Sequence, residues 1–136
     1  KEKGKPAYKI LIGCLNSHPY GEAKAVDIIK KAFLDKLYVT SSGPGAIEIM
    51  EPNVNKWGGI KILANNLGIK NDEIAAIGDS YNDLPMVENA HLGFAMGNGN
   101  EDIKKVATYV VADNNLDGIK EASEIILKYN KDNPSV

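Results

Sequence analysis

Three polar side chains that could hold a cation or a phosphate lie close together in the stretch IGDSYNDLPM. Asp79 and Asp83 supply two carboxylates four residues apart, and Asn82 adds an amide. Gly78 precedes them and lets the backbone turn without a Cβ clash. Magnesium prefers oxygen ligands and takes the remainder from water and substrate phosphate. The spacing therefore indicates a magnesium site, with the alternative that these side chains only satisfy the N-terminus of a following helix.

Lys56 is the second residue whose position suggests chemistry, because it stands at the start of an expected helix in the stretch PNVNKWGG. The helix dipole favours anions at this end, so a lysine here is electrostatically misplaced. Its position makes sense if it meets a phosphate or one of the carboxylates of Asp79 and Asp83. The alternative is an ordinary solvated lysine on the surface.

Short apolar segments that alternate with helical ones must position these residues. We expect a capped helix at 55–68, followed by strands at 74–78, 92–96 and 108–111 and helices at 82–90, 100–107 and 117–129. The inward face of the first helix is predicted to comprise Trp57, Ile60, Leu63, Ala64 and Leu67. This alternation is typical of a parallel sheet with helices on its faces, and ligands bind beyond the carboxyl ends of such strands. Asp79 stands at one of these ends.

The first fifty residues follow a different pattern. A strand at 8–13 and a helix at 22–35 precede two strands, 37–42 and 46–50, which the turn GPG separates. The composition changes near the stretch MEPNVN, where hairpin-like strands give way to strict alternation of strands and helices. We therefore expect two parts, residues 1–50 and residues 51–136.

Composition argues against several classes of partner. The net charge of −2 and the isoelectric point near 5.7 give no basic surface for nucleic acid, and Lys and Glu are spread along the 136 residues. No apolar run approaches the ~18 residues of a membrane helix. The single cysteine, Cys14, rules out an internal disulfide and fits a reducing cytoplasm. We therefore expect a cytoplasmic protein that binds neither nucleic acid nor membrane.

The segments PNVNKWGGIKILANNLGI and IAAIGDSYNDLPMVENAHLGFAMGNGN carry a family resemblance, which runs from about residue 46 to 125. They resemble the C-terminal half of haloacid-dehalogenase-like (HAD) hydrolases, and most of all the Cof-type sugar-phosphate phosphatases. In this family a lysine forms the third motif, here Lys56, and an acidic turn of the form GDxxND forms the fourth. The resemblance implies an α/β fold: half of a Rossmann-like core at 51–136, with the end of an inserted α/β cap at 1–50.

The resemblance also implies a role for each site residue. Asp79 would bind Mg²⁺, and Asp83 would be a catalytic carboxylate that supports the metal or Lys56. Asn82 would contact the phosphate or the metal shell, and Lys56 would bind phosphate and offset the acidic charge. The implied reaction is magnesium-dependent hydrolysis of a small phosphorylated metabolite through a phospho-aspartate.

The chain departs from the family pattern at the nucleophile. Family members begin with a strand that ends in Asp-x-Asp, and this sequence contains no Asp-x-Asp. Because a lysine and a metal cannot replace a covalent nucleophile, we expect the 136 residues alone to be inactive. The missing strand would leave sheet edges that favour self-association or pairing with an N-terminal half. The alternative is a truncated, non-catalytic module that binds phosphate, metal or a protein.

The stretch DNNLDGIKEASE, residues 113–124, satisfies the spacing of a calcium-binding EF-hand loop. Two features argue against calcium. The preceding TYVV is expected to be a strand rather than a helix, and Lys120 occupies a loop position where an apolar residue normally packs. We expect Asp117 to cap the last helix instead.

Overall fold

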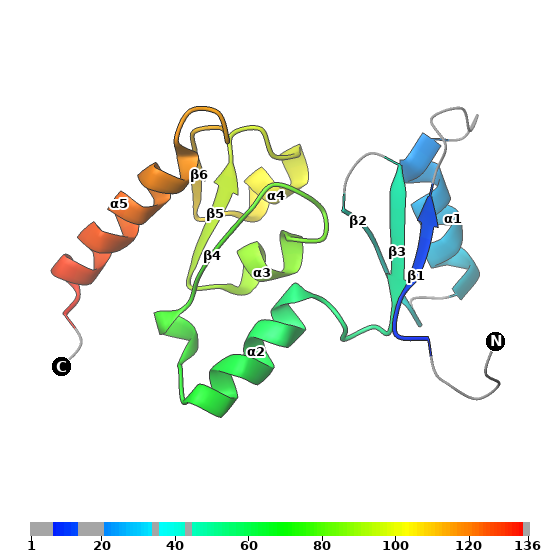
Figure 1. Cartoon of the computed structure of the whole chain (residues 1–136), viewed down its shortest axis with the longest axis horizontal. Helices are drawn as coiled ribbons and strands as arrows, with labels where there is room; N and C mark the ends of the chain where they lie inside the picture. Colours follow the sequence, from blue (N-terminus) through cyan, green and yellow to red (C-terminus); the bar gives the residue numbers. More distant parts are fainter. Residues whose placement is uncertain (1–6, 14–20, 34–35, 43–44, 135–136) are drawn as a thin grey trace. The chain divides into compact units, whose positions relative to one another are not determined.

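The structure is a computed structural model that describes residues 7–13, 21–33, 36–42 and 45–134. The chain divides into two compact units, Lys1–Asn55 and Lys56–Val136, each of which is described by itself (Figure 1). The sequence pattern suggested a boundary after residue 50, and the contacts within the chain divide it five residues later. Cys14 lies outside the described residues.

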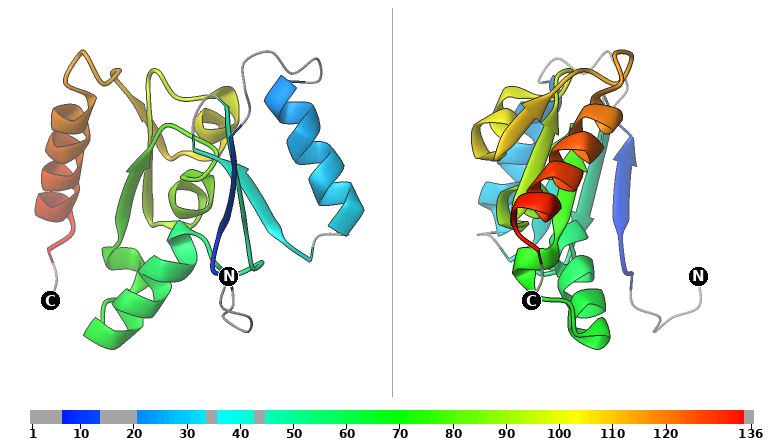
Figure 2. Two further views of the ribbon diagram at one scale, coloured as in Figure 1. Left: turned by 45° about the vertical axis from the view of Figure 1, so that its right-hand side comes forward. Right: turned by 90° about the vertical axis from the view of Figure 1, so that its left-hand side faces the viewer.

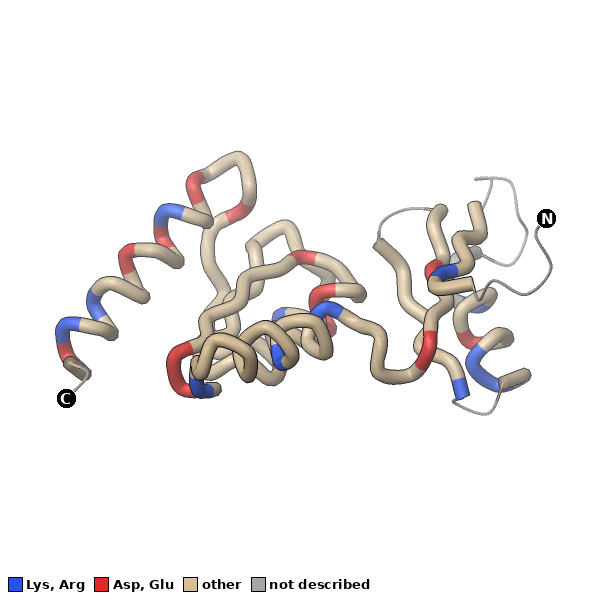
Figure 3. Tube along the Cα trace, turned by 60° about the horizontal axis from the view of Figure 1, so that its bottom comes forward, with Lys and Arg blue, Asp and Glu red and all other residues tan. Residues whose placement is uncertain are grey.

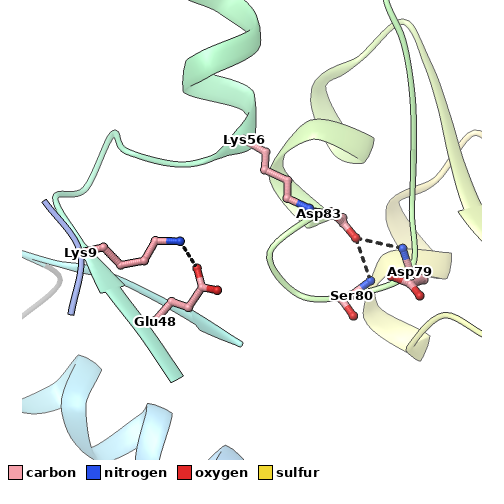
Figure 4. A network of polar contacts seen from close by, with 6 residues as sticks. All are labelled: Lys9, Glu48, Lys56, Asp79, Ser80 and Asp83. Atoms are coloured by element: carbon pink, nitrogen blue, oxygen red, sulfur yellow. Dashed lines mark hydrogen bonds and ion pairs between the residues drawn. The ribbon is translucent and has the colours of Figure 1, made fainter. Parts of the chain in front are cut away.

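The described residues of the first unit form a three-stranded antiparallel sheet and one helix. Its elements are β1 (Ile10–Gly13), α1 (Gly21–Phe33), β2 (Tyr38–Ser41) and β3 (Ala46–Met50), with the strand order β1-β3-β2. Val39, Ile47 and Ile49 form the core, against which α1 packs. The predicted hairpin is confirmed, because β2 and β3 pair antiparallel. Lys9 forms an ion pair with Glu48 across this sheet, with Nζ and Oε2 2.7 Å apart (Figure 4).

The second unit follows the predicted alternation of strands and helices. Its elements are α2 (Lys56–Leu67), the 3₁₀ helix η1 (Asn71–Glu73), β4 (Ala75–Gly78), α3 (Leu84–Asn89), β5 (Leu92–Met96), α4 (Glu101–Val106), β6 (Tyr109–Val111) and α5 (Gly118–Asp132). Gly68, at a φ of +70°, ends α2 as expected, and the N–H of Ile69 bonds back to the carbonyl of Ala64. The predicted α/β class with a parallel sheet is confirmed, whereas η1 was not predicted.

The parallel sheet of this unit has the strand order β4-β5-β6 and is covered on both faces. Helix α5 contacts one face, and α3 and α4 contact the other (Figure 2). Every residue of β5 is buried, as is usual for the central strand of a parallel sheet. Leu92, Phe94 and Met96 pack with α5, while Ala95 packs with Val87 and Ile103 on the opposite face.

Gly93 allows α3 to approach β5 closely, and this gives a first prediction. A Cβ at this position would lie 2.0 Å from the carbonyl oxygen of Val87, which is main chain and cannot move aside cheaply. We expect Gly93→Ala to lower the free energy of unfolding by about 3 kcal/mol or more, measured by urea denaturation. Gly59→Ala is the matched control. It lies in a helix with open space around its Cβ and should raise stability by about 0.5–1 kcal/mol. Equal stabilities for the two variants would contradict this packing.

The predicted inward face of α2 is partly wrong. Ala64 is buried and Trp57 and Ile60 are half-buried, but Leu63 and Leu67 are 60% and 63% exposed. The physical reason is that α2 packs on α3 along a narrow side, so the rest of its apolar face has no partner within the described part of the chain. The helical period places the apolar residues on one face of α2, but it does not show how much of that face other parts of the chain cover.

The edge of the parallel sheet at β4 is unpaired among the described residues. Strand β4 pairs only with β5 among the described strands, so its other edge carries no ladder there. In the described residues no helix has both the length and the apolar character to cross a membrane. Figure 3 shows acidic and basic residues interspersed along α5 rather than gathered in a block of one sign.

Candidate active site

The candidate site forms where β4 ends and the chain turns toward α3. Gly78 is the last residue of β4, and the buried side chain of Asp83 folds back over it. A Cβ on Gly78 would lie 2.3 Å from the Cβ of Asp83, so the glycine makes room for this carboxylate. The sequence pattern predicted a glycine that permits a turn, and the structure shows that the space it leaves is filled by Asp83.

Asp83 uses both of its oxygens within the protein. Its Oδ2 accepts hydrogen bonds from the backbone N–H groups of Asp79 and Ser80, at 3.1 and 3.2 Å (Figure 4). Its Oδ1 forms an ion pair with Nζ of Lys56. Asp83 therefore fixes the turn after β4 and holds the lysine against it.

Lys56 is the first residue of α2, and the structure supplies the anion that its position at a helix start called for. The side chain of Asp83 is only 8% exposed, whereas that of Lys56 is 48% exposed. The ion pair is thus buried on the carboxylate side and open on the ammonium side. An ammonium with three donors and one partner at its buried side can still donate to a phosphate at its open side.

Asn82 has an amide oxygen that is buried and makes no hydrogen bond to any described residue. A buried acceptor without a partner costs about 1–3 kcal/mol, so native proteins rarely leave one in place without a reason. An oxygen of this kind is suited to a donor or a cation that binds at the turn.

Asp79 directly follows β4, and both its main-chain groups are engaged. Its N–H donates to Asp83, and its carbonyl accepts from the N–H of Asn100 at 3.1 Å. Its carboxylate has one hydrogen-bond partner among the described side chains, the Nδ2 amide of Asn98 at 3.5 Å. The carboxylate is therefore oriented by the protein while most of its acceptor capacity remains open.

These residues fit a magnesium ion as a partial ligand set. The carboxylate of Asp79 and the amide oxygen of Asn82 are hard oxygen donors of the kind that Mg²⁺ takes, with several further positions left to water and substrate. Asp83 was predicted as a third ligand, but its two oxygens already serve Lys56 and the turn. The described residues contain no cluster of three or more His, Cys, Asp or Glu side chains able to hold a metal. Further ligands would have to come from outside this set.

The alternative that the three polar side chains merely cap a helix is not supported. Asp83 occupies the N-cap position of α3, but its side chain makes no capping hydrogen bond and instead points back to the turn. Pro85 lies in the first turn of α3, where its missing N–H leaves no intrahelical bond unmade.

The stretch 113–124 does not form a calcium loop. Strand β6 precedes it as predicted, and α5 begins inside it at Gly118. The carboxylate of Glu121 accepts a hydrogen bond from the N–H of Ala112 at 2.7 Å. Asp117 occupies the N-cap position of α5, as predicted, although its side chain makes no capping hydrogen bond. It adopts a left-handed conformation with a φ of 60°.

One residue of the site was missed from the sequence. Asn98 lies in the turn after β5, in the stretch AMGNG, and it contacts both Asp79 and the loop after β6. The stretch carries part of the family resemblance, but no role was predicted for Asn98. An Asn between two glycines was the one available signal, and it is too common in ordinary turns to identify a contact between distant loops.

Several known proteins are similar to this chain. A model of the haloacid dehalogenase-like hydrolase family matches residues 1–122. A phosphoglycolate phosphatase of Methanosarcina acetivorans is 41% identical over 81 residues, which is 60% of this chain and 36% of that protein. A 5-amino-6-(5-phospho-D-ribitylamino)uracil phosphatase of Bacillus subtilis is 36% identical over 87 residues, which is 64% of this chain and 35% of that protein.

Solved structures show the same fold. The structure of a sugar phosphatase of HAD subclass IIB covers 90% of this chain with a TM-score of 0.76 and 25% identity. This chain covers 44% of that structure. The chain therefore spans less than half the length of the two relatives and of this structure.

Proposed function

Because the chain belongs to the haloacid dehalogenase-like hydrolases, we propose that it is the C-terminal part of a magnesium-dependent phosphatase of the Cof type. The observation that carries the proposal is the constellation at the end of β4. There the half-exposed Lys56 forms an ion pair with the buried Asp83. The carboxylate of Asp79 and the amide oxygen of Asn82, which has no partner among the described residues, belong to the same turn. These groups suit a dianionic phosphate monoester that arrives with a divalent cation.

In this proposal each residue has a distinct task. Lys56 binds a phosphate oxygen through the open side of its ammonium group and balances negative charge as it develops. Asp83 is the supporting carboxylate that fixes the position of Lys56. Asp79 and Asn82 hold Mg²⁺, and Asn82 can instead offer its amide to the phosphate. When bound, the metal would supply Lewis-acid stabilisation of charge on the transferring phosphoryl group.

The nucleophile of the proposed reaction lies outside this chain's motifs. We propose that the full-length protein supplies an aspartate that forms a phospho-aspartate, which water then hydrolyses. The same upstream part would complete the sheet along the free edge of β4 and cover the exposed Leu63 and Leu67 of α2. Without it, these surfaces favour self-association.

The substrate class in this proposal is a small phosphorylated metabolite, such as a sugar phosphate. The relatives named above act on chemically different phosphate esters, as their names state, so the shared element is the phosphate. The proposal includes a cytoplasmic location, because the single cysteine fits a reducing compartment. The proposal includes neither nucleic acid nor a membrane as a partner.

A comparison of the 136-residue chain with the full-length protein tests this proposal. We expect the full-length protein to release phosphate from a generic ester such as p-nitrophenyl phosphate in the presence of Mg²⁺. The 136-residue chain should release none above background, and it should sediment as oligomers. A full-length protein that begins near Lys1, or that binds phosphate without turnover, would instead identify a non-catalytic module.

A further inference from the structure

Asn98 connects the loops that follow all three strands of the parallel sheet. Its Oδ1 accepts a hydrogen bond from the N–H of Asn114 at 3.0 Å, and its Nδ2 donates to Oδ2 of Asp79 at 3.5 Å. Asp79 follows β4, Asn98 follows β5 and Asn114 follows β6. One exposed side chain thus joins the candidate metal ligand Asp79 to the loop that carries Asn114, 16 residues after Asn98.

The orientation of the Asn98 amide is determined by its two neighbours. A backbone N–H can only donate, and an ionised carboxylate can only accept. The amide oxygen must therefore face Asn114, and the amide nitrogen must face Asp79. In the opposite orientation the amide nitrogen would face the N–H of Asn114, which is also a donor. The amide oxygen would face the carboxylate of Asp79, which is also an acceptor.

The turn that carries Asn98 is held on both sides. The N–H of Gly97 bonds to the carbonyl of Ala112, and a Cβ on Gly97 would lie 3.0 Å from the nitrogen of Asp113. On the other side, the N–H of Asn100 donates to the carbonyl of Asp79. These main-chain bonds position the Asn98 backbone independently of its side-chain contacts.

The loop after β6 is equally well ordered, so it offers a fixed donor. Oδ1 of Asp113 accepts from the N–H of Asn115 at 2.7 Å, and its carbonyl accepts from Leu116 and Gly118 at 3.0 and 3.3 Å. These bonds leave the N–H of Asn114 directed at Asn98. The segment whose spacing imitates a calcium loop thus serves as a support for the neighbouring turn.

We propose that Asn98 is a positioning residue that holds one oxygen of the Asp79 carboxylate, so that the other is directed to Mg²⁺. The inference rests on the proposed function, in which Asp79 is a metal ligand. Partners of this kind fix the orientation of a ligating carboxylate, and their loss commonly weakens metal binding by about 10–100-fold. Because this bond is long, the effect should lie at the lower end of that range.

Titration calorimetry of the full-length protein with Mg²⁺ alone tests the inference. We expect Asn98→Ala to weaken Mg²⁺ binding about tenfold and to lower turnover at limiting Mg²⁺. Asn114→Ala is the matched control, because it keeps the main-chain N–H, and it should leave Mg²⁺ binding unchanged. Unchanged binding in Asn98→Ala would overturn the inference.

Asn98→Asp separates positioning from simple anchoring of the loop. It keeps an acceptor for the N–H of Asn114 but replaces the donor to Asp79 with a repelling carboxylate. Positioning predicts that its turnover falls at least as far as that of Asn98→Ala at limiting Mg²⁺. Anchoring alone predicts wild-type turnover and Mg²⁺ binding, which would overturn the inference.

Asp79→Ala in the same titration distinguishes a failure of the positioning inference from a failure of the proposed function. If it loses Mg²⁺ binding while Asn98→Ala does not, only the positioning inference fails. If Asp79→Ala binds Mg²⁺ like the parent, the proposed function itself fails.

Discussion

Asp83→Ala is expected to lower the free energy of unfolding by about 2–4 kcal/mol and to abolish turnover in the full-length protein. The substitution removes the ion pair with Lys56 and leaves the N–H groups of Asp79 and Ser80 without their acceptor. Most of the loss should come from those two donors, because an ion pair with a half-exposed lysine contributes about 1 kcal/mol or less. Turnover should be lost because Lys56 and the turn that carries Asp79 both lose their support.

Asp102→Ala is the matched control for this prediction. Asp102 also pairs with a lysine, Lys105, but both side chains are more than half exposed. We expect its loss to change the unfolding free energy by less than about 1 kcal/mol. Urea denaturation of both variants provides the measurement. An Asp83→Ala protein as stable as the Asp102→Ala protein would show that Asp83 does not brace the turn.

Asp79→Ala is expected to have the opposite profile, with a large effect on turnover and a small one on stability. Among the described residues its carboxylate contacts only Asn98, through a long hydrogen bond, so its removal breaks no strong bond there. Loss of a metal ligand removes several kcal/mol of transition-state stabilisation, which corresponds to a fall in kcat/KM of about 10³-fold or more. Phosphate release by the full-length variant at saturating Mg²⁺ measures this.

Asp72→Ala controls for the loss of an acidic residue as such. Asp72 is exposed on η1, before β4, whereas Asp79 follows that strand. Its replacement should leave turnover within about twofold of the parent, since surface substitutions of this kind are usually near neutral. Retention of parental turnover by Asp79→Ala would remove Asp79 from the site.

Periodicity predicted the elements of this chain well, because strands and helices differ in where they repeat apolar residues. The run LGFAM was recognised as a strand, and the structure buries all five residues between helices on two faces. Gly68 was recognised as the end of a helix, since only glycine adopts a positive φ without strain. These features depend on local chemistry, which a single sequence displays directly.

The errors concern contacts that local chemistry does not determine. Leu63 and Leu67 lie on the apolar face of α2, but no described residue covers them. Their burial depends on which other segments pack against α2, and the helical period does not show this. The ion pair of Asp83 with Lys56, 27 residues away, was among the expected alternatives, but the bonds of Asp83 to the N–H groups of Asp79 and Ser80 were not. Asn98 was missed for the same reason, because its two partners lie 19 and 16 residues away in sequence.

The candidate site was therefore predictable as a set of residues but not as a network. Lys56, Asp79, Asn82 and Asp83 were all named from residue type and spacing, and the structure gathers them at the end of one strand. Their connections follow from the close approach at Gly78 and from the loops after β5 and β6. These depend on how the strands are ordered in the sheet.

The central claim is that the end of β4 forms half of a magnesium-dependent phosphoryl-transfer site. The most direct measurement is phosphate release by the full-length protein from a panel of small phosphate monoesters, first with Mg²⁺, then after EDTA, and then after Mg²⁺ is restored. The account predicts turnover that EDTA removes and Mg²⁺ restores. Turnover that persists without a divalent cation, or no turnover on any monoester, would contradict it.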